Sequence, residues 1–280
     1  MLGSVTVRVL DDRHRAEALA ILDADPVSNV FVSSRVHAAG LDPRRLGAQM
    51  WGYLRDGRLV SLCYSGANLI PVAAGPEAVR AFAERAQAQG RRCSSIVGPV
   101  DAVGDLWEIL APYWGPARAV RAVQPVMATS AVPAVPADPR VRRVRMEEFD
   151  IVYPACVAMF TEEVGVSPNA GDGGVLYRAR VAELIRDGRA FARIEDGRVM
   201  FKAEVGAVTP RACQVQGVWV PPDLRGRGLS ETGMSAVVRE ALRTIAPTVS
   251  LYVNDYNTRA RAAYRRVGFT ELGSFTSILF

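Results

Sequence analysis

The spacing of apolar and polar residues changes along the chain in a way that predicts alternating strands and helices. Residues 5–10 alternate with a period of two, which is typical of a half-buried strand. Residues 15–22 and 29–39 have helical spacing, and Asp56-Gly57 predicts a tight turn between two strand-like runs. The other elements expected in this half are strands at 50–54, 58–64, 68–73 and 93–97 and helices at 77–89 and 103–110.

The second half repeats this order of elements. It begins with a strand at 141–144 and contains a hairpin around Asp196-Gly197. We therefore expect an α/β (α+β) fold made of two similar halves, each a mixed, mostly antiparallel sheet flanked by helices. The elements expected here are helices at 149–163, 175–186 and 230–245, strands at 190–194, 199–208, 213–220 and 249–254, a helix around Tyr264 and a final pair of strands ending at Phe280.

An Ala/Pro-rich segment separates the two halves. Residues 128–139 read ATSAVPAVPADP, a composition typical of an extended linker. We expect an N-terminal domain at 1–127, a linker at 128–139 and a C-terminal domain at 140–280.

The composition is that of a globular protein with packed cores. Hydrophobic residues make up 49% of the chain, and we expect neither a membrane span nor a secretion signal. The four cysteines are scattered without the spacing of a metal site, which predicts reduced thiols, no metal and a cytoplasmic location. These cysteines are Cys63, Cys93, Cys156 and Cys213.

The net charge of +5 comes almost entirely from arginine, since Lys202 is the only lysine. Such a bias is typical of GC-rich coding sequences, as in actinobacteria. No arginine cluster alternates with aromatic residues, so we expect no nucleic-acid partner. The charge suits phosphate groups or an acidic partner, and the oligomeric state stays open.

Residues 218–230 read VWVPPDLRGRGLS and predict a strand, a glycine-containing turn and a helix. Gly226 and Gly228 permit positive φ and carry no Cβ, so that successive N–H groups can converge on one point. The following helix adds free N–H groups and the positive end of its dipole, and Arg225 and Arg227 add charge. This order predicts a phosphate-binding loop; the alternative is an ordinary basic turn before a helix.

A second motif follows about thirty residues later, with the spacing N-x-x-A-x-x-x-Y-x-x-x-G-F from Asn257 to Phe269. Asn257, Arg261 and Tyr264 lie on one face of the expected helix. Together with Arg-x-x-Gly-x-Ser at 225–230, this motif resembles the GNAT N-acetyltransferases. The usual loop of that family is Arg/Gln-x-x-Gly-x-Gly/Ala, and Ser230 departs from it with another small residue.

The resemblance implies an acetyl-CoA-dependent transferase in which a primary amine attacks the thioester directly in a ternary complex. It further implies that the thioester carbonyl bonds to a backbone N–H of residues 218–220 and that the Tyr264 hydroxyl lies near the sulfur. Tyr264 could instead be a packed aromatic residue, and Asn257 could hold the pantetheine arm or merely cap the helix. The expected cofactor-binding residues are Val218, Trp219, Val220, Arg225, Gly226, Arg227, Gly228, Leu229, Ser230, Asn257 and Arg261.

The general base stays open. Glu204 shares a strand face with Lys202 and is a catalytic candidate if that face meets the site, or a solvated residue if the face is exposed. Glu162 and Glu163 end a helix where GNAT enzymes meet the acceptor, so they could bind an amine or form a solvated helix end. Both histidines lie in the N-terminal half, which argues against a histidine base.

The N-terminal half lacks both motifs at the corresponding places, near residues 74–76 and 98–101. We interpret it as a degenerate GNAT-like domain that has lost CoA binding. This layout and the segment MFTEEVG at 159–165 resemble actinobacterial acetyltransferases with an extra N-terminal domain.

Two other functions remain under consideration. One is a CoA-responsive binding or regulatory module without turnover. The other is aminoacyl-tRNA-dependent transfer by a tandem pair, which the retained phosphate loop argues against. The sequence does not identify the amine acceptor, which could be a small molecule or a protein. We also expect Glu231 to turn away from bound phosphates and to pair with Arg225 or Arg227 or to face the acceptor pocket.

Overall fold

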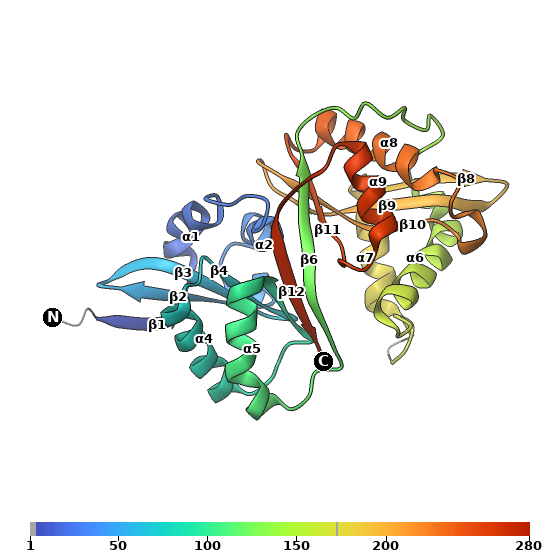
Figure 1. Cartoon of the computed structure of the whole chain (residues 1–280). Helices are drawn as coiled ribbons and strands as arrows, with labels where there is room; N and C mark the ends of the chain where they lie inside the picture. The colour runs from blue at the N-terminus through green and yellow to red at the C-terminus, as the bar shows by residue number, and fades with distance from the viewer. Residues whose placement is uncertain (1–3, 172) are drawn as a thin grey trace. The chain divides into compact units, whose positions relative to one another are not determined.

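The structure is a computed structural model that describes residues 4–171 and 173–280, and its chain divides into two compact units (Figure 1). Unit 1 comprises the residues up to Met127 together with Tyr252–Tyr256 and Glu271–Phe280. Unit 2 comprises Ala128–Leu251 and Asn257–Thr270. Each unit is a mixed sheet flanked by helices. The domain limits expected from the sequence, 1–127, 128–139 and 140–280, remain a prediction.

The sheet of unit 1 has the strand order β1-β2-β3-β4-β5-β12-β6. Strands β2 and β3 are antiparallel, with Arg55 opposite Arg58, which confirms the hairpin expected at Asp56-Gly57. Strands β4 and β5 are parallel. The strands are β1 (Val5–Val9), β2 (Gln49–Arg55), β3 (Arg58–Ser65), β4 (Asn68–Val72), β5 (Ser95–Pro99), β6 (Ala119–Thr129) and β12 (Thr270–Leu279).

Two hydrophobic clusters fill unit 1, one on each face of its sheet. Alternate residues of β2 divide between them: Met50 joins the cluster that contains α1 and α2, whereas Trp51 and Tyr53 join the cluster that contains α4 and α5. This division follows from the period of two in a strand. The helices are α1 (Arg15–Leu22), α2 (Val30–Ala39), α3 (Pro43–Leu46), α4 (Pro76–Gln89) and α5 (Val100–Trp114).

Strand β12 is the last strand of the chain, and it belongs to unit 1 from Glu271 onward. It lies between β5 and β6, with Ile278 opposite Ile96 of β5. The Ser277 hydroxyl donates to Gln124 Oε1 of β6 at 2.5 Å. The expected final pair of strands is therefore wrong, because residues 270–279 form one strand. Its partners lie more than a hundred residues away in the chain, where a local pattern cannot show them.

The sheet of unit 2 has the strand order β11-β10-β9-β8-β7. Its pairs are antiparallel except for β10 and β11, which are parallel. The strands are β7 (Arg142–Arg143), β8 (Ala190–Glu195), β9 (Arg198–Val208), β10 (Cys213–Trp219) and β11 (Val249–Tyr252).

Helices cover both faces of the unit 2 sheet (Figure 1). Residues of α6 and α7 share one cluster with Ala190, Ala192 and Val199 of β8 and β9. On the opposite face α8 comes so close that a Cβ on Gly233 would lie 2.8 Å from the Phe201 ring. The helices are α6 (Phe149–Val164), α7 (Val175–Arg186), α8 (Leu229–Thr244) and α9 (Thr258–Val267). Across the described residues, no helix is both long and apolar enough to cross a membrane.

Candidate functional site

Strand β10 leaves its parallel partner after two residue pairs. Cys213 and Gln214 lie opposite Val249 and Ser250 of β11, and the ladder stops there. Strand β10 nevertheless continues to Trp219, paired on its other edge with β9. Backbone groups on the β11 side of β10 are therefore outside that ladder after Gln214, and a buried backbone donor outside a ladder needs another partner.

The loop that follows β10 ends at the beginning of α8. Gly226 and Gly228 have φ angles of 78° and 76°, in the left-handed region that the sequence requires of them. Gly228 is the N-cap of α8 and provides no side-chain cap. Within the described residues, no protein acceptor bonds to the backbone N–H groups of 226–230. The loop therefore presents a row of free donors at the positive end of a helix, which is a site for an anion.

The guanidinium of Arg225 points to the end of α6. Its Nη2 donates to Glu162 Oε2 at 2.7 Å, and its Nε donates to the Val220 carbonyl at 3.0 Å. Trp219 Nε1 donates to the same carboxylate oxygen at 3.3 Å. The hydrogen bond from Arg225, and after it the one from Trp219, lowers the pKa of Glu162. Glu162 is thus an ionised carboxylate that links the end of β10 to the anion-binding loop.

Helix α9 carries the two other residues that the sequence selected for this site. Asn257 is its N-cap, and its side chain accepts a hydrogen bond from the Ala260 N–H at 3.2 Å. Tyr264 is 7% exposed, and its ring packs against that of Phe269. Burial, and after it the negative charge of Glu163, raises the pKa of Tyr264. Its phenol is therefore protonated at neutral pH.

Comparison with known proteins identifies this part of the chain. Residues 175–269 match the acetyltransferase (GNAT) family, and residues 48–152 match a domain of unknown function (DUF4081). The first of these matches contains β10, the anion-binding loop and Tyr264. The chain carries a GNAT acetyltransferase domain.

The relatives of the GNAT domain include a curated protein and solved structures. A peptidyl-lysine N-acetyltransferase of Salmonella typhimurium is 30% identical over 97 residues, which are 35% of this chain and 63% of that protein. The chain thus spans less than two thirds of that relative's length. A GCN5-related N-acetyltransferase from Sphaerobacter thermophilus has a TM-score of 0.62 at 16% identity, covering 98% of this chain and 94% of that chain. A tandem GNAT protein from the clavulanic acid biosynthesis pathway has a TM-score of 0.54 at 16% identity, covering 99% and 98%. These likenesses confirm the tandem GNAT-like fold.

Inside the GNAT domain, Glu204 is buried and already has a cation as its partner. It is 5% exposed, and its Oε1 lies 2.7 Å from Lys202 Nζ. The Cys156 thiol of α6 donates to the same oxygen at 3.5 Å. The strand face that carries Lys202 and Glu204 is therefore buried, and the alternative of a solvated face is wrong.

The expected linker lies along α8 of the GNAT domain. The Ser235 hydroxyl donates to the Val135 carbonyl at 2.6 Å, and Arg239 Nη2 donates to the Pro133 carbonyl at 2.5 Å. Residues 130–138 form neither a helix nor a strand, and they are attached to the helix that begins at the anion-binding loop.

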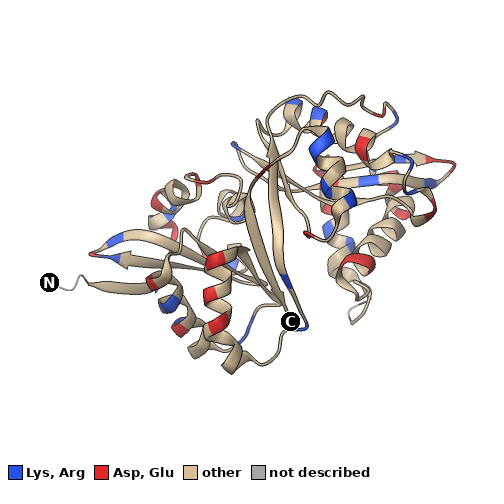
Figure 2. Ribbon diagram, viewed as in Figure 1, with Lys and Arg blue, Asp and Glu red and all other residues tan. Residues whose placement is uncertain are grey.

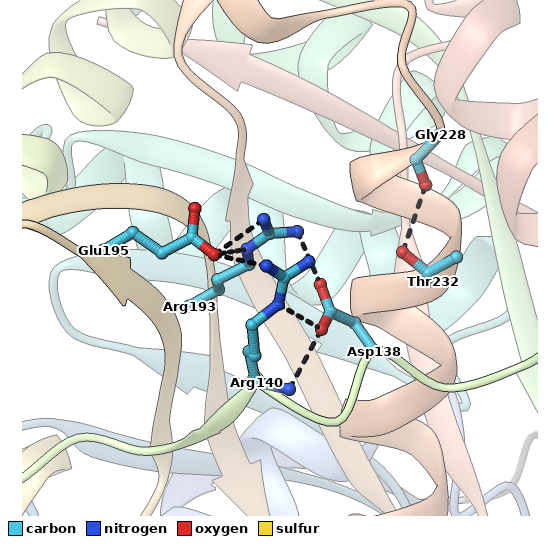
Figure 3. Close-up of polar contacts among 6 residues, drawn as sticks. All are labelled: Asp138, Arg140, Arg193, Glu195, Gly228 and Thr232. Carbon is cyan, nitrogen blue, oxygen red and sulfur yellow. Dashed lines mark hydrogen bonds and ion pairs between the residues drawn. The ribbon is translucent and has the colours of Figure 1, made fainter.

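Asp138 joins the first turn of α8 to the sheet, and Figure 3 shows its carboxylate among Arg140, Arg193 and Glu195. Its backbone N–H donates to the Thr232 carbonyl at 3.1 Å, and its buried carboxylate accepts from Arg193 Nη1 of β8 at 2.8 Å. Glu195 holds both Arg193 and Arg140 around this carboxylate. Asp138, held by Arg193 and Arg140, therefore attaches the first turn of α8, and with it the adjoining loop, to strand β8.

The structure corrects the expected partner of Glu231. Its carboxylate pairs with Arg266 of α9, with neither Arg225 nor Arg227. Arginine residues are frequent in α9 (Figure 2), and Glu231 pairs with one of these cations on the neighbouring helix. A local sequence pattern cannot show this pair, because 35 residues separate its members.

Glu231→Gln should tighten the binding of acetyl-CoA about twofold at low ionic strength, because it removes a negative charge near the phosphate donors and frees Arg266. Calorimetric titration at low and high salt measures this, and the gain should vanish at high salt. Glu240→Gln, at the other end of α8, is the matched control and should change nothing. A large loss of affinity in Glu231→Gln would show that the carboxylate organises the loop.

The corresponding helix start in unit 1 has a different chemistry. Helix α4 begins with Pro76, which has no N–H, after Gly75. Glu77 in its first turn places a carboxylate at the positive end, where it pairs with Arg55 and accepts from the Tyr53 hydroxyl at 3.2 Å. An anion would meet a missing donor and a negative charge there.

Other expected residues are distributed as follows. Glu162 and Glu163 are exposed at the end of α6 in the GNAT domain, whereas both histidines lie in unit 1. Among the described residues, no cluster of three or more His, Cys, Asp and Glu side chains could hold a metal ion. The sequence missed two contacts that shape the site, Arg225 with Glu162 and Asp138 with α8. Both join segments distant in the chain, and neither leaves a periodic signal.

Proposed function

We propose that the GNAT domain is an acyl-CoA-dependent N-acyltransferase that moves the acetyl group of acetyl-CoA to a primary amine by direct attack in a ternary complex. The observation that carries this proposal is the uncapped start of α8 beside the unpaired edge of β10. Free N–H donors, two glycines with positive φ and an open strand edge together suit a ligand with a pyrophosphate at one end and an amide-rich arm at the other.

Different residues of the site bind different parts of acetyl-CoA. The backbone N–H groups of 226–230 bind the pyrophosphate, because they are free and lie at the positive end of the α8 dipole. The edge of β10 at residues 218–220 bonds to the arm and to the thioester carbonyl. Asn257 acts by capping α9, and Arg261 on the same helix is our further candidate for binding the phosphates.

Acetyl-CoA supplies the acyl group in activated form, as a thioester. When the C–N bond to the amine forms and the C–S bond breaks, the sulfur takes the electron pair and needs a proton. Tyr264 holds that proton on its phenol, since burial raises the pKa of the group. A positioned acid of this kind contributes typically about 10²–10⁴-fold to a rate.

The acceptor amine must reach the site as a free base. Glu162 and Glu163 place carboxylates at the end of α6, where an ammonium group can bind. Because the pKa of Glu162 is lowered by Arg225, that carboxylate contributes charge, and the ammonium group gives up its proton to water. Glu204 is already engaged by Lys202 and Cys156, which favours a supporting role for it.

Gly228→Val should weaken acetyl-CoA binding at least about tenfold, because a branched residue resists the left-handed φ that presents the donors. Calorimetric titration measures this in a variant whose thermal unfolding is checked. Gly57→Val is the matched control, since Gly57 has a φ of 77° in the β2–β3 hairpin turn of unit 1 and also has no atom near its Cβ position. Equal affinities of a folded Gly228→Val variant and the control would remove the loop from the proposal.

A further inference from the structure

Lys202 is the only lysine in a chain of 33 arginines, since lysine and arginine total 34, and its side chain is 1% exposed. Its ammonium meets two oxygen acceptors, Glu204 Oε1 at 2.7 Å and the Gly217 carbonyl at 2.9 Å. The Cys156 thiol donates to the same oxygen of Glu204. Burial alone lowers the pKa of Lys202, but Glu204 and Cys156 outweigh it and raise the pKa, so the group is a buried cation. A compact ammonium fits this arrangement, whereas a planar guanidinium does not.

The Gly217 carbonyl lies in a bulge of β10. Gln216 is opposite Glu204 and Trp219 is opposite Lys202, so β10 has one residue more than β9 between these pairs. Gly217 has a φ of 61°, which turns its peptide out of the regular strand. Lys202 provides a charged donor for the carbonyl that this turn exposes.

The buried pair is not explained by stability alone. Desolvating two charges costs about as much as their attraction returns, and apolar pairs of similar size commonly replace such pairs without loss. The pair instead fixes the orientation of one peptide group. The Gly217–Val218 peptide is trans, so its N–H points away from the carbonyl that Lys202 holds. A cation bonded to the carbonyl also polarises the N–H of the same peptide.

Building on the proposed function, we propose that Lys202, neutralised by Glu204, is a positioning residue that holds the bulge at Gly217 so that the backbone N–H groups of residues 218–220 polarise the thioester carbonyl. Lys202 touches neither substrate; it acts through one peptide group. The proposal rests on the two oxygen acceptors of Lys202 and on the bulge that contains one of them.

The test uses the full chain with Lys202→Met and Glu204→Gln combined, so that no unpaired charge stays buried. Infrared spectroscopy of bound acetyl-CoA labelled with ¹³C at the thioester carbonyl measures the polarisation directly. In the wild type the carbonyl band should move to lower frequency than in free acetyl-CoA, and the double variant should lose most of that shift. Its dissociation constant for acetyl-CoA should stay within about threefold, since the phosphates bind elsewhere, and kcat should fall about 10²-fold.

Arg142→Met with Glu148→Gln is the matched control, because it removes another ion pair of unit 2 with a buried carboxylate and should leave the band in place. If the first variant does not fold, Gly217→Ala replaces it, since the added Cβ would lie 3.1 Å from Lys202 Nζ and strains the bulge. An unchanged band in a folded variant that binds acetyl-CoA would overturn the proposal. If the wild type acetylates no amine, the proposed function fails, but the band still decides the role of Lys202.

Discussion

Deleting residues 271–280 should unfold unit 1, whereas unit 2, whose last segment ends at Thr270, loses none of its residues. Strand β12 lies between β5 and β6, and its loss separates β6 from the other strands of unit 1. Phe275 and Ile278 are buried there, and each such side chain contributes about 1.5–3 kcal/mol. The hydrogen bonds of the Thr276 and Ser277 hydroxyls to β6 go as well. Together these losses approach the whole stability of a domain, about 5–15 kcal/mol.

Tryptophan fluorescence can follow unit 1 alone. Three of the four tryptophans, Trp51, Trp107 and Trp114, lie in unit 1, so Trp219→Phe removes the signal of unit 2. In that background the deletion should abolish the unfolding transition seen with urea. Leu272→Ala, at an exposed position of β12, is the control and should keep it. A deletion variant with an unaltered transition would show that β12 is dispensable for unit 1.

Tyr264→Phe should lower kcat at least about 10²-fold and leave the affinity for acetyl-CoA nearly unchanged. The change removes only a hydroxyl, which donates no hydrogen bond to another described residue, so the fold should be kept. The hydroxyl is the group that we propose as proton donor to the departing sulfur, and its raised pKa keeps it protonated at neutral pH.

Steady-state kinetics with saturating acetyl-CoA measures this effect, and calorimetry checks that binding persists. Tyr113→Phe, at an exposed position of α5 in unit 1, is the matched control and should behave as the wild type. If Tyr264→Phe kept the wild-type kcat, Tyr264 would be only a packed aromatic side chain on an amphipathic helix.

Features encoded within a short stretch of sequence were predicted well. The spacing of apolar residues predicted α1 and α7 to the residue, and the Asp-Gly dipeptides predicted both hairpins. The left-handed conformations of Gly226 and Gly228 also follow from local chemistry, because the order of strand, turn and helix demands them. Asn257 caps its helix, as a short polar side chain in that position commonly does.

Features that depend on distant partners were not predictable from one sequence. A period of two places Lys202 and Glu204 on one face, but it does not say that α6 covers that face with Cys156. Strand β12 alternates like any strand, and only the pairing with β5 reveals its place. Arg225 was expected to serve phosphate groups; its pairing with Glu162 becomes visible only when α6 and the loop are folded together.

A product assay tests acetyl transfer by the GNAT domain most directly. The full chain is incubated with acetyl-CoA and a panel of small amines, amino acids, aminoglycosides and lysine-containing peptides, and mass spectrometry follows acetylated amines while a thiol reagent follows free CoA. We expect one acetylated acceptor class, formed in equal amount with free CoA, and a loss of this activity in Gly228→Val at limiting acetyl-CoA. Saturable binding of acetyl-CoA with no acetylated product across the panel would contradict it and would indicate a CoA-responsive module instead.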